Sequence, residues 1–189
     1  KVDGCVNYKT VSSALHDGCA GGIVGNSTAG NITNSSNYGE VLTTNGAGGG
    51  ILGRGLPNIS ACYNTAKISG RYIGGIAGRV ETTNFSISDS FNTGELKTAA
   101  FANAVAGGIL GTFKDGATLT GKIENCYSIG NIDATNKAPV CGPDNDSVTI
   151  EVSNCYYTDS SLTDLYDGTT VKAKNDFNTL STIGLDEHE

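Results

Sequence analysis

Apolar residues recur along this chain in short clusters, and Gly-, Asn-, Ser- and Thr-rich stretches separate the clusters. One cluster reads Gly-Gly-Ile-x-Gly, and its isoleucines are Ile23, Ile51, Ile76 and Ile109. The other begins with a small residue, which an aromatic residue and usually an asparagine follow. Short Val-, Ile- and Tyr-containing segments between turn residues favour β-strands joined by tight corners.

The second cluster defines the repeat. Its copies begin at Cys5, Ser35, Cys62, Ser90, Cys126 and Cys155, at spacings of 30, 27, 28, 36 and 29 residues. Two phrases that recur in a fixed order at such a period indicate a solenoid, in which each unit is stable only against its neighbours. We therefore expect an all-β fold, a parallel β-helix (β-solenoid) of about six coils with two or three strands per coil. Residues 1–159 would form the repeats and 160–189 a short C-terminal cap or linker.

Stacked coils place equivalent side chains in rows along the solenoid axis. The four isoleucines of the glycine phrase would form one inward row. A second apolar row would contain Val11, Val41, Ile68, Leu96 and Ile132. A row of Asn7, Asn37, Asn64 and Asn92 would hydrogen-bond from coil to coil, as stacked asparagines do in cross-β structures. The polar stretches 26–34, 79–87 and 112–118 are expected to be loops that contribute to binding.

Four of the six cysteines share the small position with two serines, which indicates that the position requires a small side chain. The favoured interpretation is a row of free thiols that pack as small apolar groups. The alternative is a disulfide between Cys126 and Cys155, because neighbouring rungs lie about 4.8 Å apart. A zinc site is not expected, because no Cys-x-x-Cys sequence occurs.

Charge and composition exclude several function classes. A net charge of −7 and a pI near 4.7 disfavour binding to nucleic acid or to anionic membranes. The chain has no 18-residue apolar run, so membrane insertion is not expected. It begins with Lys1 rather than Met, so we expect it to be part of a larger polypeptide. His16 has only Asp17 and Cys19 as reactive neighbours in sequence, so no catalytic residues and no enzyme activity are expected.

An aromatic row is the candidate ligand-binding site. Tyr63, Phe91, Tyr127 and Tyr156 each follow the small position directly. Neighbouring residues of a strand face opposite sides, so these rings lie outside if the small residues lie inside. Exposed stacked rings beside Asn and Thr would then contact a glycan or an extracellular protein. The simpler interpretation is that the rings belong to the core.

A calcium ion is the one cofactor that the sequence brings into consideration. Asp144, Asn145 and Asp146 supply the oxygen ligands that Ca²⁺ prefers, and a structural Ca²⁺ site there is one interpretation. The spacing and the closing glutamate of an EF-hand are missing, so an ordinary turn is the simpler interpretation.

The order Gly-Gly-Ile-x-Gly, loop, Cys-Tyr-Asn-Thr-Gly-x-Ile resembles the GLUG repeat of large bacterial surface proteins, including the non-catalytic part of some immunoglobulin A peptidases. The resemblance covers about residues 5–159, and the closing Asn154-Cys155-Tyr156-Tyr157 also resembles the end of such arrays. It implies a secreted, extracellular segment on a bacterial cell surface. Its role would be that of an adhesin for a host or environmental glycan or protein, or of a stalk that projects other domains. The resemblance carries no catalytic residues, and a polysaccharide lyase or hydrolase on a β-helix is the remaining alternative.

Overall fold

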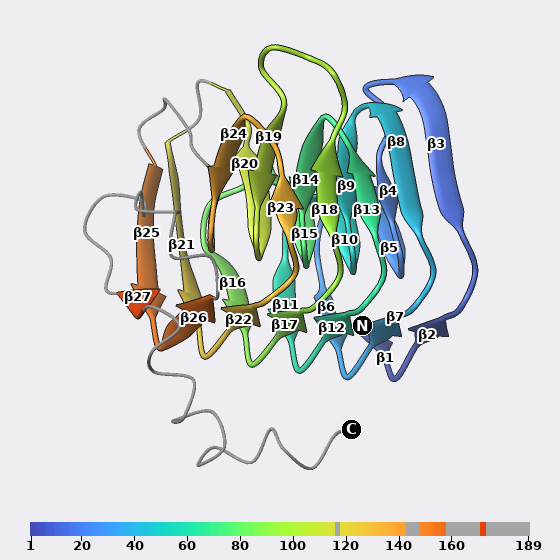
Figure 1. Ribbon diagram of the computed structural model, residues 1–189. Helices are drawn as coiled ribbons and strands as arrows, with labels where there is room; N and C mark the ends of the chain where they lie inside the picture. Colours follow the sequence, from blue (N-terminus) through green and yellow to red (C-terminus); the bar gives the residue numbers. More distant parts are fainter. Residues whose placement is uncertain (116–117, 143–147, 158–170, 173–189) are drawn as a thin grey trace.

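The protein is a parallel β-solenoid. The computed structural model describes residues 1–115, 118–142, 148–157 and 171–172, and these residues form strands, bridges, turns and bends without a helix. Equivalent strands of successive coils pair in parallel in five sheets, which gives about five turns (Figure 1). The predicted all-β, parallel β-helical fold is confirmed.

Each coil contributes one short strand to each sheet. Sheet A contains β1 (Val2–Asp3), β6 (Asn31–Thr33), β11 (Asn58–Ser60), β16 (Phe85–Ser88), β21 (Leu119–Glu124) and β25 (Val148–Ser153). Sheet B contains β2 (Val6–Asn7), β7 (Ser36–Asn37), β12 (Tyr63–Asn64), β17 (Phe91–Asn92), β22 (Tyr127–Ser128), β26 (Cys155–Tyr157) and β27 (Val171–Lys172). Sheet C contains β3 (Val11–His16), β8 (Val41–Asn45), β13 (Ile68–Gly70), β18 (Leu96–Thr98) and β23 (Ile132–Asp133).

The last two sheets flank the glycine phrase. Sheet D contains β4 (Ala20–Gly21), β9 (Ala47–Gly49), β14 (Tyr72–Gly74), β19 (Val105–Gly107) and β24 (Asn136–Ala138). Sheet E contains β5 (Val24–Ser27), β10 (Leu52–Gly55), β15 (Ala77–Val80) and β20 (Leu110–Phe113). A complete coil therefore has five short strands, and the expectation of two or three was wrong.

Some strands of sheet A are hard to recognise in the sequence. In β6 and β11 a single inward isoleucine, Ile32 or Ile59, stands between Asn and Ser or Thr. Such a segment has the composition of a loop, although its one apolar side chain is 3% or 1% exposed. The predicted loops at 26–34, 79–87 and 112–118 are therefore partly strand, because they include β6, most of β16 and the ends of β5, β15 and β20.

The apolar rows form the core as predicted. Ile51, Ile76 and Ile109 are fully buried in the larger cluster, and Ile23 of the first coil packs against it. The second row is buried at Val41, Ile68, Leu96 and Ile132, and Val11 packs against that cluster. Each fully buried aliphatic side chain contributes about 1.5–3 kcal/mol. The rows therefore supply much of the free energy that holds the coils together.

Coil length varies at only two of the five corners in the described part of the chain. Sheet B leads into sheet C with the same spacing in every coil, as from Asn64 to Ile68 and from Asn92 to Leu96. The corner between sheets C and D is instead short after Gly70 and long after Thr98. The corner between sheets E and A also varies. Insertions are thus confined to the corners that no buried polar row crosses.

The predicted cap lies mostly outside the described residues. Within 160–189 the structure describes β27, which pairs in parallel with β26 through Cys155 and Tyr156. The boundary at residue 159 and the cap or linker role stay predictions. Among the described residues, no helix is long and apolar enough to cross a membrane.

Candidate functional site

The corner between sheets A and B sets the direction of the candidate site residues. The residue just before the small position has a positive φ in every coil: 63° at Gly4, 50° at Asn34, 51° at Ala61, 49° at Asp89, 53° at Asn125 and 50° at Asn154. Gly, Asn and Asp adopt this left-handed conformation most easily, and Ala61 adopts it at some cost. The turn directs the small residue inward and the following aromatic residue outward.

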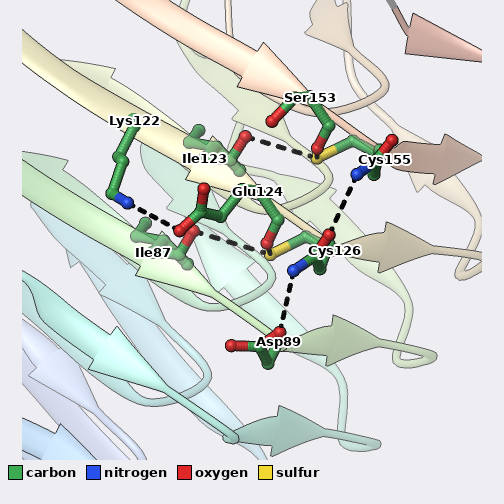
Figure 2. A network of polar contacts seen from close by, with 10 residues as sticks. Ile87, Asp89, Lys122, Ile123, Glu124, Cys126, Ser153 and Cys155 are labelled. Atoms are coloured by element: carbon green, nitrogen blue, oxygen red, sulfur yellow. Dashed lines mark hydrogen bonds and ion pairs between the residues drawn. The ribbon is translucent and has the colours of Figure 1, made fainter.

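The small residues form a buried row. Cys62, Ser90, Cys126 and Cys155 are at most 1% exposed. Figure 2 shows the Cys126 and Cys155 thiols directed at backbone oxygens of Ile87 and Ile123, at 3.8 and 3.6 Å. Cys126 and Cys155 are free thiols, as are Cys5 and Cys62 at the same position, so the free-thiol interpretation is confirmed and the Cys126–Cys155 disulfide is not formed. Burial raises the pKa of the Cys62 thiol to about 11 and also raises the pKa of Cys126.

The asparagine row hydrogen-bonds from coil to coil, as predicted. Asn37 Nδ2 donates to Asn64 Oδ1 at 2.7 Å, and Asn64 Nδ2 donates to Asn92 Oδ1 at 2.8 Å. Each of these side chains also donates to the backbone carbonyl two residues further on, at 2.8, 2.8 and 3.0 Å. The row continues to Ser128 and is fully buried from Asn37 to Asn92. Its role is therefore structural.

The glycine phrase makes room for the asparagine row. A Cβ on Gly50 would lie 2.6 Å from the side-chain amide carbon of Asn64, and one on Gly75 would lie 2.5 Å from that of Asn92. Both distances are far below contact distance, so glycine is required wherever an asparagine of the row packs. The two sequence phrases recur together because they contact each other across the interior of the solenoid.

The aromatic row lies on the outside of the same strands. Tyr63 stacks on Phe91 with ring centroids 4.8 Å apart and an interplanar angle of 1°, and Phe91 stacks on Tyr127 at 4.7 Å and 4°. These three rings are half-buried, so the core interpretation is wrong for them. Tyr156 is only 7% exposed, but its register with Tyr127 places it in the same outward row. Burial raises the pKa of the Tyr127 hydroxyl to about 12.

Two tyrosines that the sequence analysis missed extend this row. Tyr8 stacks on Tyr38 at 5.1 Å and 7°, and Tyr38 meets Tyr63 edge to face with a hydrogen bond between their hydroxyl groups. In these two coils the position directly after the small residue holds Val6 or Ser36 instead of an aromatic residue. Tyr8 and Tyr38 come two positions later. Residues two apart in an extended segment share a face, so an aromatic residue two positions further on was the sequence signal for Tyr8 and Tyr38.

A groove runs beside the C-terminal part of the aromatic row. It has a volume of about 560 Å³ and is lined by Asp89, Ser90, Phe91, Asn125, Tyr127, Asn154 and Tyr156. Its polar residues form their own chain: Asn125 Nδ2 donates to Asp89 Oδ1 at 3.0 Å, and Asn154 Nδ2 donates to Asn125 Oδ1 at 3.2 Å. Apolar rings beside a few placed polar groups are typical of small-ligand sites. We call this site the aromatic groove.

The structure brings together three of the four predicted ring residues in this groove and places Tyr63 in the row outside it. Sequence reasoning missed Asn125 and Asn154, although an Asp or Asn directly before the small position marks them in the last three repeats. The proposed calcium ligands Asp144, Asn145 and Asp146 lie outside the described residues. Within the described part of the chain, no group of three or more His, Cys, Asp or Glu side chains is placed to hold a metal ion.

Comparison with known proteins supports the fold and does not show a family. No protein-family model matches the chain, and no curated protein matches it. The fold is similar to the 1.30 Å crystal structure of a "putative immunoglobulin A1 protease from Bacteroides ovatus", with 24% identity and a TM-score of 0.52. The match covers 86% of this chain and 46% of that chain, so this chain spans less than half the length of that protein. The likeness concerns the fold alone, and the GLUG resemblance stays a prediction.

Proposed function

We propose that this chain is a non-catalytic segment of a bacterial cell-surface protein and that it binds an extracellular glycan in the aromatic groove. The groove carries the proposal, because it combines Phe91, Tyr127 and Tyr156 with the side chains of Asp89 and Asn125. Ring surfaces contact the apolar faces of a sugar, while amide and carboxylate groups exchange hydrogen bonds with its hydroxyl groups. The GLUG resemblance and the likeness to the Bacteroides ovatus protein are consistent with an extracellular location.

A rigid spacer that projects other domains is the second candidate. The stacking of the rings favours it, because Tyr63, Phe91 and Tyr127 present their faces to one another with ring centroids 4.7–4.8 Å apart. The buried asparagine row adds a second continuous contact along the axis. Both features stabilise a stack of coils without any ligand.

Binding of the purified chain to a mixed array of glycans and matrix proteins separates the two candidates. The test variant is Tyr127→Ala, which removes a ring that lines the groove. The matched control is Tyr8→Ala, which removes a 70% exposed ring from the same row outside the groove. Parallel arrays with Ca²⁺ and with a chelator test the calcium site proposed at Asp144, Asn145 and Asp146.

We expect saturable binding to a glycan, loss of that binding in Tyr127→Ala, and unchanged binding in Tyr8→Ala. Binding that survives Tyr127→Ala would place the ligand elsewhere on the surface. A blank array from protein that circular dichroism shows to be folded would favour the spacer. Binding only to matrix proteins would replace the glycan by a protein partner. Release of reducing ends from a polysaccharide panel would contradict the non-catalytic role.

A further inference from the structure

All three arginines of the chain lie on or directly beside sheets D and E. Arg54 of β10 and Arg79 of β15 are direct partners in the parallel register of sheet E. Arg71 directly precedes β14, and its guanidinium carbon lies 4.6 Å from the ring centroid of Tyr72. The guanidinium carbon of Arg79 lies 5.8 Å from the same centroid. Tyr72 thus joins Arg71 to Arg79, and the register of sheet E joins Arg79 to Arg54. We call these three residues the arginine cluster.

The cluster carries more positive charge than its neighbours compensate. Arg54 Nε lies 3.5 Å from Glu81 Oε1, and Arg79 Nη2 lies 3.7 Å from Asp115 Oδ2. The Asp115 side chain is 93% exposed, so its pair with Arg79 is weak and easily exchanged. Arg71 has a neutral acceptor, Asn45 Oδ1, at 2.9 Å. Like charges directly opposite each other in a sheet are destabilising, so an added anion would stabilise this group.

The arginine donors are also under-used. The Nε–H groups of Arg54, Arg71 and Arg79 are buried and make no hydrogen bond among the described residues, although Arg54 Nε lies at ion-pair distance from Glu81 Oε1. Buried unpaired donors are rare, and each costs about 1–3 kcal/mol. The side chains of Arg54 and Arg79 are 28% and 18% exposed, so part of each guanidinium still reaches solvent. A planar guanidinium fork at such a surface suits a carboxylate in two-point contact.

We propose that the arginine cluster binds the carboxylate of an acidic sugar of the uronic acid type. Phe101, which is 40% exposed and has its ring centroid 5.5 Å from the Arg71 guanidinium carbon, supplies an apolar surface for the sugar ring next to the charge. The chain has a net charge of −7, and Glu81 and Asp115 flank the cluster, so partners with many negative charges are repelled. A small ligand with a single carboxylate, such as one uronic acid unit, satisfies both conditions. This site is separate from the aromatic groove, which is lined from sheet B and the corner between sheets A and B, and it stands whether or not that groove binds a glycan.

The three arginine Nε–H groups are themselves the probes for a test by nuclear magnetic resonance. Because the chain has only three arginines and their Nε atoms are buried, we expect three resolved ¹⁵N-labelled Nε–H signals in the purified chain. Sodium galacturonate is titrated against galactose, sodium acetate and N-acetylglutamate, with sodium chloride at equal ionic strength. We expect galacturonate to shift the three signals saturably, acetate to shift them more weakly, and galactose and sodium chloride to leave them unchanged.

Two variants test which groups hold the ligand. Arg79→Lys keeps the charge and removes the planar fork, so we expect galacturonate affinity to fall about tenfold, the value of one charge-assisted hydrogen bond. Phe101→Ala changes an exposed side chain and should weaken galacturonate binding while leaving acetate binding unchanged. Lys122→Gln on sheet A is the charge control and should have no effect.

Each contrary result overturns the proposal at a defined point. If sodium chloride shifts the Nε–H signals as much as galacturonate does, the shifts report charge screening and not ligand binding. If Arg79→Lys has a dispersed spectrum and an unchanged galacturonate affinity, the guanidinium fork of Arg79 does not hold the ligand. N-acetylglutamate that binds as tightly as galacturonate would remove the sugar as the recognised class. If Arg79→Lys does not fold, an unchanged galacturonate affinity in Phe101→Ala overturns the sugar contact by itself.

Discussion

Replacing Asn64 by alanine tests whether the asparagine row holds the coils together. The Asn64 side chain is fully buried and takes part in four hydrogen bonds. It donates to Ala66 O and to Asn92 Oδ1, both at 2.8 Å, and it accepts from Asn37 Nδ2 at 2.7 Å and from Ala66 N at 3.3 Å. All four are lost in Asn64→Ala, and the partner groups stay buried.

The expected cost follows from these bonds. Each contributes about 0.5–1.5 kcal/mol net, and a buried donor left without a partner adds about 1–3 kcal/mol. Asn37 and Asn92 keep their bonds to the backbone near Gly39 and Gly94, which limits the damage. We therefore expect Asn64→Ala to lower the free energy of unfolding by about 3–5 kcal/mol, a large part of the stability of an ordinary domain.

Urea unfolding followed by circular dichroism measures this loss. The matched control is Asn7→Ala, which removes an asparagine at the end of the same row. Its two bonds with Lys9 are exposed to water, and Asn37 Oδ1, which loses one donor, still accepts from Gly39 N. We expect Asn7→Ala to cost less than about 1 kcal/mol. The variant Asn64→Ser should fall between the two, because Ser128 already continues the row with a hydroxyl group. The dependence of the unfolding free energy on urea concentration should stay unchanged; a lower value in a variant would show that the repeat array no longer unfolds as one unit.

The reasoning would be refuted if Asn64→Ala cost less than about 1 kcal/mol, or if it cost no more than Asn7→Ala. Either result would mean that the apolar rows alone hold successive coils in register.

Three further outcomes follow from the same contacts. Gly75→Ala should destabilise strongly in urea unfolding, because its Cβ would collide with the next coil, whereas Gly25→Ala should be tolerated with its nearest atom 3.8 Å away. Phe91→Ala should lose about 1–3 kcal/mol through its two ring pairs, measured in the same way. The Cys62 thiol has a pKa of about 11, above its ordinary value of 9.0, so the unfolded chain ionises first and stability should fall as pH rises between these values. Cys62→Ser should remove that part of the pH dependence in unfolding measurements.

The rows were predictable from sequence because each coil contributes one residue to each row at nearly constant spacing. Ile76 and Asn64 could be assigned to the interior, since the same residue types recur at equivalent positions in other coils. The number of strands per coil could not be predicted, because a strand such as β11 contains a single apolar residue, Ile59. The period of two residues, rather than identity at one position, would have revealed Tyr8 and Tyr38.

The candidate sites were harder to predict from the sequence than the fold. The aromatic groove depends on the left-handed corner that carries Asn125, and the sequence marks this corner only by an asparagine that is also common in turns. The arginine cluster depends on the contact between two sheets. Arg54 and Arg79 do occupy the same position after the glycine phrase, but Arg71 joins them only through the ring of Tyr72.

The corner between sheets B and C is constant in length, and the corner between sheets C and D is variable. This difference decides where such a chain can gain residues during evolution. One extra residue between Asn64 and Ile68 would turn a side chain of the buried rows toward solvent and misalign every later coil. Extra residues after Thr98 leave the rows aligned, and Phe101 stands in such an extension. Duplication of a coil, followed by drift in length at the tolerant corners, therefore yields new surface chemistry on an unchanged interior.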